Sequence, residues 1–206
     1  MEKISDSSPN TKKKLVGSFI PSPVRSLKVL NSNNLTDEQY KVLSAVMHGQ
    51  NLFFTGSAGT GKSYLLKFII SRLPPDTTFV TASTGIAACH IGGITLHMFA
   101  GISANWLEEM QLNTQITSKD IAARIMKNQS KVNRLRLCKC LIVDEISMVS
   151  GDYFELLDQV ARIIRRNNKP FGGIQLVLSG DFLQLPPITK KGKLKKKYLI
   201  LKKILH

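Results

Sequence analysis

The sequence predicts an α/β domain in which a parallel β-sheet carries helices on both of its faces. Short runs of consecutive apolar residues alternate with longer segments whose apolar residues recur at helical spacing. Apolar runs without polar alternation are typical of strands that are buried on both sides. Three of the runs lead directly into glycines or acidic residues, which suits a sheet that binds ligands at the carboxyl ends of its strands.

Eight elements are predicted from these patterns. The helices are expected at about 37–48, 62–73, 84–90 and 152–167, and the strands at 52–55, 78–82, 140–143 and 175–179. Thr36 followed by Gln39 has the form of a capping box, which begins the first helix, and Gly49 ends it. A Gly-rich turn joins the first strand to the second helix, which Pro74 and Pro75 stop.

The segment at 101–136 has a weaker pattern. It is more polar and helical in character, with a loop expected near 111–120. The last helix is better defined, because five apolar residues recur within it at helical spacing: Phe154, Leu157, Val160, Ala161 and Ile164. Gly172 and Gly173 then mark a turn before the final strand.

The composition is that of one globular domain. Hydrophobic residues make up 43% and charged residues 21% of the 206 positions, close to globular averages. No apolar run reaches the roughly 18 residues of a membrane span, and the N-terminus lacks the apolar core of a signal peptide, so we expect no membrane partner. The odd set of Cys89, Cys138 and Cys140 predicts reduced thiols, and a lone C-x-C pair is a weak metal signal.

The net charge of +15 is concentrated at the two ends of the chain. Residues 1–34 carry +4 and are predicted to form a disordered basic tail, residues 190–206 carry +8, and the domain at 35–189 carries only +3. The basic ends attract phosphate backbones without specificity. The lysine-rich tail at 190–206 either forms a basic amphipathic helix or is an extension without a fold of its own, as a truncated gene model or an alternative exon end would produce.

One octapeptide carries the strongest chemical signal, Gly56-Ser57-Ala58-Gly59-Thr60-Gly61-Lys62-Ser63. It matches G-x-x-x-x-G-K-[ST], follows a predicted strand and opens a predicted helix, as a phosphate-binding P-loop requires. The glycines let several backbone N–H groups point at an anion. Lys62 is expected to reach the β- and γ-phosphates of ATP, and Ser63 to offer its hydroxyl to magnesium. The alternative is a Gly-rich turn that happens to precede Lys-Ser.

Further candidate site residues lie after the strands predicted at 140–143 and 175–179, and one lies before the strand at 52–55. Asp144 is expected to hold magnesium through water, and Glu145 to orient and polarise the attacking water. The alternative is a pair of acids that simply ends a strand. Gln184 is an uncharged hydrogen-bonding side chain that can sense the γ-phosphate. Gln39 can read adenine because an amide both donates and accepts, although Gln is also the ordinary third residue of a capping box.

Taken together, these segments resemble the petite integration frequency (PIF-type) DNA helicases of superfamily one. The resemblance is carried by FFTGSAGTGKSYLL (53–66), TASTGIAACHIGGITLHMFAGI (81–102), LIVDEISMV (141–149), DYFELLDQVARIIRRNNKPFGGIQL (152–176) and GDFLQLPP (180–187). The block at 152–176 resembles a signature of this family between its second and third helicase motifs. The resemblance covers residues 35 to about 189 and implies a RecA-like P-loop NTPase domain there.

The resemblance also implies roles for individual residues. It makes Gln39 the adenine reader, residues 59–63 the phosphate cradle, and Gln184 the γ-phosphate sensor, and it makes Asp144 and Glu145 the magnesium and water pair. Four residues fall in segments that resemble the single-strand DNA contacts of the family: Thr84, Gly85, His97 and Phe99. The two rings suit base stacking and Thr84 suits a phosphate, while core packing is an equal alternative for both rings.

Membership of this family implies a monomeric ATPase that moves five-prime to three-prime along single-stranded DNA. Such helicases unwind duplexes, DNA junctions, RNA–DNA hybrids and G-quadruplexes in the nucleus and mitochondrion, where they serve DNA repair, recombination and telomere maintenance. The sequence leaves the family pattern near Thr189, before the second RecA-like domain that supplies an arginine to the transition state. We therefore predict that this polypeptide binds nucleotide but by itself hydrolyses it poorly and does not translocate. A non-catalytic ATP- and DNA-binding fragment is one alternative, and another P-loop ATPase, such as a transposon-borne relative, is the other.

Overall fold

The computed structural model of the chain describes residues 35–57, 59–113 and 115–181. The predicted tails at 1–34 and 190–206 lie outside these residues, as do Ala58 and Gln184. Within the described ranges, no helix is both long enough and apolar enough to cross a membrane.

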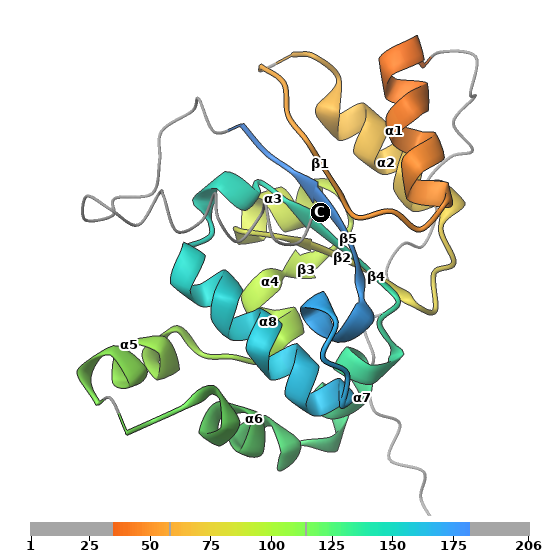
Figure 1. The fold of residues 1–206 in the computed structure, drawn as a ribbon. Coiled ribbons are helices and arrows are strands. Elements are labelled where there is room, and N and C mark those ends of the chain that lie inside the picture. The colour runs from red at the N-terminus through yellow and green to blue at the C-terminus, as the bar shows by residue number, and fades with distance from the viewer. Residues whose placement is uncertain (1–34, 58, 114, 182–206) are drawn as a thin grey trace, which may run out of the picture.

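A five-stranded parallel sheet forms the centre of the domain (Figure 1). Its strands are β1 (Leu52–Phe54), β2 (Thr78–Ala82), β3 (Ile94–Thr95), β4 (Cys140–Asp144) and β5 (Gln175–Ser179). Their order across the sheet is β1-β5-β4-β2-β3, and every pairing is parallel. The predicted α/β class with a parallel, RecA-like sheet is therefore confirmed. Parallel strands all end at the same edge, so the turns that follow them share one side of the molecule.

Eight α-helices and two short 3₁₀ turns connect the described strands. They are α1 (Asp37–Met47), α2 (Lys62–Arg72), α3 (Gly85–His90), α4 (Leu96–Ala100), α5 (Ala104–Leu112), α6 (Ser118–Met126), α7 (Gln129–Leu137), η2 (Ile146–Met148), α8 (Gly151–Arg165) and η3 (Pro170–Gly173). The capping box predicted from Thr36 and Gln39 is present at the start of α1, with both reciprocal hydrogen bonds. Because the box satisfies two backbone N–H groups, it fixes where this helix begins.

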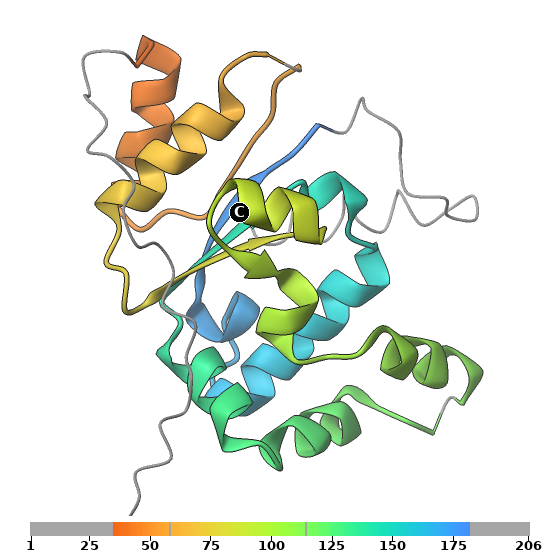
Figure 2. The same cartoon turned by 180° about the vertical axis from the view of Figure 1, so that it is seen from behind.

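Two hydrophobic cores lie on opposite faces of the sheet, and they separate the helices into two layers (Figures 1 and 2). Successive residues of β4 alternate between them: Leu141 and Val143 join one core, while Cys140 and Ile142 join the other. The larger core contains residues of α4, α6, α7 and α8, and the smaller core contains residues of α1, α2 and α3. Burial on both faces explains why the strands read as unbroken apolar runs.

The structure differs from the sequence-based expectation mainly between β2 and β4. The edge strand β3 and the five-residue helix α4 were not expected, and the predicted helical region at 101–136 consists of α5, α6 and α7. The loop expected near 111–120 is shorter, because α5 continues to Leu112 and α6 begins at Ser118. A strand of two residues and a helix of five are too short to show a period in the sequence.

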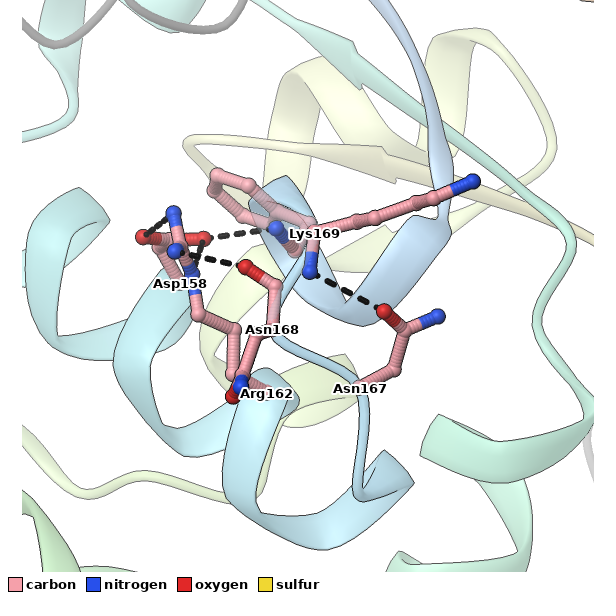
Figure 3. Close-up of polar contacts among 6 residues, drawn as sticks. Asp158, Arg162, Asn167, Asn168 and Lys169 are labelled. Atoms are coloured by element: carbon pink, nitrogen blue, oxygen red, sulfur yellow. Dashed lines mark hydrogen bonds and ion pairs between the residues drawn. The ribbon is translucent and has the colours of Figure 1, made fainter.

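A polar cluster closes the end of α8 onto the turn before β5 (Figure 3). Arg162 forms an ion pair of 2.8 Å with Asp158 one turn earlier and donates through Nη1 to the carbonyl oxygen of Asn168 at 2.9 Å. The Asp158 carboxylate also accepts the backbone N–H of Phe171 at 2.6 Å. These bonds hold the chain where it leaves the helix, and Phe171 is fully buried against Phe154 as a result.

Candidate functional site

The turns that follow β1, β5 and β4 meet at the carboxyl edge of the sheet. The P-loop follows β1, residues Gly180 and Asp181 follow β5, and Glu145 follows Asp144 at the end of β4. Because β5 lies between β1 and β4, the P-loop and the acidic pair stand on either side of the end of β5. The sheet order therefore brings together two motifs that are about eighty residues apart in the sequence.

The backbone of the P-loop depends on its glycines. Gly59 and Gly61 have φ angles of 83° and 84°, a region that side chains disfavour. Gly56 has an ordinary φ, but a Cβ there would lie only 2.6 Å from Oγ1 of Thr60. That hydroxyl donates to the carbonyl oxygen of Ser57 at 2.9 Å, which closes the loop on itself. The glycines thus allow the tight backbone turns by which a P-loop surrounds a phosphate with N–H groups.

Lys62 is the first residue of α2, and its ammonium group folds back over the loop. Nζ donates to the carbonyl oxygen of Ser57 at 2.9 Å and also to that of Gly56. Ser63 follows with an exposed side chain in the first turn of the helix. Phosphates are stabilised at a helix N-terminus by its free N–H groups and its dipole, so an anion held by this loop would lie beside the lysine.

Gln39 reaches the P-loop from α1. A Cβ at Gly61 would lie 3.0 Å from its Nε2, while its Oε1 accepts the backbone N–H of Thr36. The amide therefore caps α1 and faces the P-loop at the same time. Beside it is a pocket of about 380 Å³, lined by Thr36, Glu38, Gln39, Val42, Phe54, Thr55, Gly56, Thr60, Lys62 and Leu65. Among these, the apolar Val42, Phe54 and Leu65 together with the Gln39 amide offer the chemistry that a nucleotide base requires.

The acidic pair at the end of β4 is held by specific bonds. Ser179, the last residue of β5, donates its hydroxyl to Oδ1 of Asp144 at 2.6 Å. The backbone N–H of Glu145 donates to the same oxygen at 3.0 Å. Glu145 itself lies in the left-handed region, with φ 52° and ψ 43°. A non-glycine residue in this conformation costs free energy, and such strain is concentrated at functional sites.

Burial raises the pKa of the Glu145 carboxyl, and the negative charge of Asp144 raises it further. Lys62 opposes this by lowering the pKa, and Asp181 adds a smaller upward effect. These couplings place the P-loop lysine and three carboxylates within electrostatic reach of one another. Asp181 is buried, with 6% of its surface exposed, and the sequence-based assignment gave it no role. The signal that could have found it is its position directly after a buried strand, beside Gly180.

The oxygen donors at this edge fit a magnesium ion that is bound together with a nucleotide. Both hydrogen bonds that the described residues make to the Asp144 carboxylate end on Oδ1, which leaves Oδ2 for the ion or its water. Ser63 adds a hydroxyl. No three His, Cys, Asp or Glu side chains of the described residues are arranged to hold a metal by themselves. Magnesium bound by one carboxylate, one hydroxyl and phosphates needs no such cage.

Two of the four candidate DNA contacts lie at the start of α3. The hydroxyl of Thr84 accepts the backbone N–H of Ala87 at 3.2 Å and so caps this helix. Gly85 is exposed, and a Cβ there would meet nothing within 4 Å. Both residues follow β2, two strands away from β5 across the sheet. Their predicted role in DNA binding stays a prediction.

The other two candidates lie on α4 and have different environments. His97 is exposed as a residue, but its ring packs on that of Tyr153 with 4.2 Å between centroids. This partial burial of the imidazole lowers its pKa. Phe99 is fully buried and packs on Phe79 with 5.2 Å between centroids. Base stacking by Phe99 is therefore the wrong interpretation, because no part of this ring is available to a ligand. Core packing, the alternative for both rings, describes Phe99 alone.

Two exposed apolar side chains accompany these candidates. Ile86 is 75% exposed next to Gly85, and Met98 is 60% exposed next to His97. Large apolar side chains at such exposure, beside a candidate binding surface, suit contact with bases. Sequence reasoning missed them because each resembles an ordinary core residue until the helix face is known.

Comparison with known proteins gives the same assignment. The model of the PIF1-like helicase family matches residues 34–203. The ATP-dependent DNA helicase PIF1 of Rattus norvegicus is 53% identical over 171 residues, which cover 82% of this chain and 25% of the rat protein. The chain likewise spans about a quarter of the length of the human and mouse proteins of the same name.

Solved structures show the same relationship. The crystal structure of the Pif1 helicase from Candida albicans superposes with a TM-score of 0.66 at 50% identity, over 75% of this chain and 34% of that chain. The Pif1 helicase from Bacteroides in complex with ADP-AlF3 and ssDNA superposes with a TM-score of 0.60 at 35% identity, over 78% of this chain and 35% of that chain.

Proposed function

The chain belongs to the PIF1-like helicase family, and from this we propose that it is an ATP-binding motor domain of an ATP-driven DNA helicase. The observation that carries the proposal is the position of the P-loop and the Asp144–Glu145 pair on either side of the end of β5. The longer relatives are named ATP-dependent DNA helicases, which supports a role for this domain in the same activity.

In the proposed reaction, water attacks the γ-phosphate of ATP and the bond to the β-phosphate oxygen breaks, which yields ADP and inorganic phosphate. Lys62 and the P-loop N–H groups stabilise the charge on the phosphates, and Glu145 orients the attacking water and accepts its proton. Magnesium, held by Ser63 and Asp144, would supply further positive charge. Gln184 remains our predicted γ-phosphate sensor, and Gln39 our predicted adenine contact.

Single-stranded DNA is the proposed track of the motor. Thr84, Gly85 and His97, together with the exposed Ile86 and Met98, form the proposed contact surface at the carboxyl edge. The presence of ssDNA in the Bacteroides structure supports this class of ligand. Movement five-prime to three-prime, action as a monomer on DNA junctions and G-quadruplexes, and a role in genome maintenance in the nucleus or mitochondrion belong to the same proposal.

A second candidate function applies to the 206-residue polypeptide by itself, since it matches only 25% of the length of the rat relative. In that case the polypeptide binds ATP and DNA but does not act as a helicase. An arginine donated to the transition state is worth about a thousandfold or more in rate, so its absence from the reacting complex would leave binding without efficient hydrolysis.

The two candidates are separated by measuring magnesium-dependent ATP binding and DNA-stimulated hydrolysis on the same purified polypeptide. Both predict ATP binding that is lost in Lys62→Ala. DNA-stimulated turnover that is also lost in this variant supports the motor, whereas binding without turnover supports the binding fragment. If adenine nucleotides do not bind in the presence of magnesium, both candidates are wrong.

A further inference from the structure

The charges of the described domain are separated by segment. Residues 121–143 contain six Lys or Arg and no acid, and residues 159–180 contain four Lys or Arg and no acid. The rest of the region 35–189 contains all twelve of its Asp and Glu residues and only five Lys or Arg. The small net charge of the domain thus results from a strongly basic part and an acidic part that cancel.

The two acid-free segments meet at the amino edge of the sheet, opposite the nucleotide site. Arg165 at the end of α8 donates through Nη1 to the carbonyl oxygens of Leu135 at 2.6 Å and Cys138 at 2.8 Å. In the other direction, Nε of Arg136 donates to the carbonyl oxygen of Ile164 at 3.2 Å. These bonds join the ends of α7 and α8 just before β4 and β5 begin.

A pocket of about 440 Å³ lies between these helix ends, lined by Arg136, Ile164, Arg165, Arg166, Asn167 and Gly172. Lys139 and Lys169 are linked to these residues through the backbone: Lys139 follows Cys138, whose carbonyl accepts from Arg165, and the carbonyl of Lys169 accepts the N–H of Gly172. We call these five cations the amino-edge basic face: Arg136, Lys139, Arg165, Arg166 and Lys169. All except Arg165 are exposed.

Helix-end electrostatics do not account for this much charge. The carbonyl ends of α7 and α8 carry about half a negative charge each, which the nearby arginines complement. Neither of the ion pairs among the described residues includes a cation of this face, so none of its five charges is cancelled by one of them. The carbonyls that bind Arg136 and Arg165 are neutral groups, so they orient these guanidiniums without cancelling their charge. A surplus of several positive charges therefore remains.

We propose that the amino-edge basic face binds the phosphate backbone of DNA at a second contact, separate from the proposed DNA surface at the carboxyl edge. The inference rests on the proposed function, because it assumes that DNA is bound there first. Guanidinium forks match phosphate oxygens, and several cations around an open pocket suit an extended polyanion better than a single small anion. The two segments that supply these five cations contain no acid of their own that would repel that backbone.

The position of the face makes the proposal testable by DNA length. A five-residue strand such as β4 spans roughly 17 Å from edge to edge. Phosphates along one strand of duplex DNA repeat about every 3.4 Å, so DNA that reaches both edges needs at least about five nucleotides beyond the first contact. Short DNA can therefore occupy only one of the two surfaces.

The experiment compares two triple variants of the full chain on single strands of about four and about thirty nucleotides. Lys139→Gln, Arg166→Gln and Lys169→Gln neutralise exposed side chains of the face. Lys41→Gln, Lys67→Gln and Lys119→Gln remove the same charge elsewhere on the described domain. Arg136 and Arg165 are kept because they hold the fold. Unchanged ATP affinity at the opposite edge shows that both variants are folded.

On the long strand, the face variant should lose about 2 from the slope of log affinity against log salt concentration, since each single-strand phosphate contact contributes about 0.7. It should match the unaltered chain on the short strand, and the control variant should keep its slope on both. Equal slopes for the two variants on the long strand overturn the inference and leave the proposed function standing. Lack of binding to either strand by the unaltered chain overturns both.

An acidic protein is the other partner that a basic surface could take. If a polyglutamate peptide binds the unaltered chain and not the face variant, while the slopes on the long strand stay equal, the face belongs to an acidic protein and the inference is overturned.

Discussion

Lys62 and Arg165 lie at opposite edges of the sheet, and both donate to backbone carbonyl oxygens. The partners of Lys62 are Gly56 and Ser57, which lie six and five residues away within its own loop. Arg165 donates to Gly172 at 2.7 Å and, through Nη1, to three carbonyls of the segment 135–138, which lie 27–30 residues away. The first cation closes a local turn, whereas the second joins two helices and the start of a strand.

The comparison teaches that the role of a cation bound to carbonyls depends on how far those carbonyls lie from it in the sequence. Bonds within one loop restrain few residues, so a ligand can replace them at little cost to the fold. Bonds between distant segments hold the tertiary structure, and losing them leaves partly buried carbonyls without donors. We therefore expect Lys62 to matter for binding and Arg165 for stability.

The largest effect is expected for Arg165→Ala. Loss of four charged hydrogen bonds should lower the free energy of unfolding by about 3 kcal/mol, measured by urea denaturation without nucleotide. The matched control is Arg166→Ala, because Arg166 is adjacent and exposed. Its left-handed backbone is equally unfavourable for arginine and for alanine, so the substitution does not change that strain. That control should change stability by less than about 0.5 kcal/mol. Equal losses in the two variants would show that the long-range bonds do not stabilise the fold.

Lys62→Ala should show the opposite pattern. ATP affinity should fall by about a hundredfold, which corresponds to roughly 2.8 kcal/mol, since the ammonium no longer faces the phosphates. The free energy of unfolding without nucleotide should change by less than about 0.5 kcal/mol. Titration calorimetry and urea denaturation of the same preparation provide both values. A variant that loses stability and retains affinity would reverse the roles that we assign to the two cations.

The smallest effect concerns the acidic side of the nucleotide site. Burial, with Asp144 adding to it, raises the pKa of Glu145 above its ordinary value of 4.5, so the folded protein holds this proton more tightly than the unfolded chain. Ionisation at higher pH therefore costs stability. Glu145→Gln should raise Tm by about 1–3 °C at neutral pH in the absence of nucleotide.

The pH dependence identifies the cause of this gain. The gain in Tm should shrink as the pH falls through the raised pKa of Glu145. It should vanish below about 4.5, where this carboxyl is protonated in both the folded and the unfolded protein. Glu108→Gln, a change at an exposed glutamate of α5, should leave Tm unchanged at either pH. If the gain from Glu145→Gln is the same at low and neutral pH, the effect comes from packing and not from charge.

The nucleotide site could be predicted from sequence because its parts are contiguous and chemically distinctive. The P-loop octapeptide and the acids after β4 are each defined by residue type and by an adjacent apolar run. Parallel strands then bring these ends to one edge, so the fold class by itself predicts their proximity. Asp181 was missed because one acid after one strand carries no specific pattern.

The remaining parts depend on packing that the sequence does not display. His97 and Phe99 are two residues apart in a helix of five residues, and only contact with Phe79 shows that the phenylalanine faces the core. Arg165 has no signal, because its partners are backbone carbonyls, which every residue possesses. Gln39 illustrates a third case: capping and adenine recognition were weighed as alternatives, and the side chain caps α1 while it also lines the pocket beside the P-loop, so adenine recognition stays a prediction.

Gly180 packs the end of β5 against the turn that follows Glu145, the predicted catalytic glutamate. A Cβ at this position would lie 3.1 Å from Cγ2 of Ile146 and 3.2 Å from the backbone nitrogens of Ile146 and Ser147. The backbone at Gly180 therefore packs closely against the turn at Ile146 and Ser147, because Gly180 has no side chain between them. A displacement of either turn is therefore passed to the other, so the segment that leads to the predicted phosphate sensor is coupled to the residue that we predict to activate water.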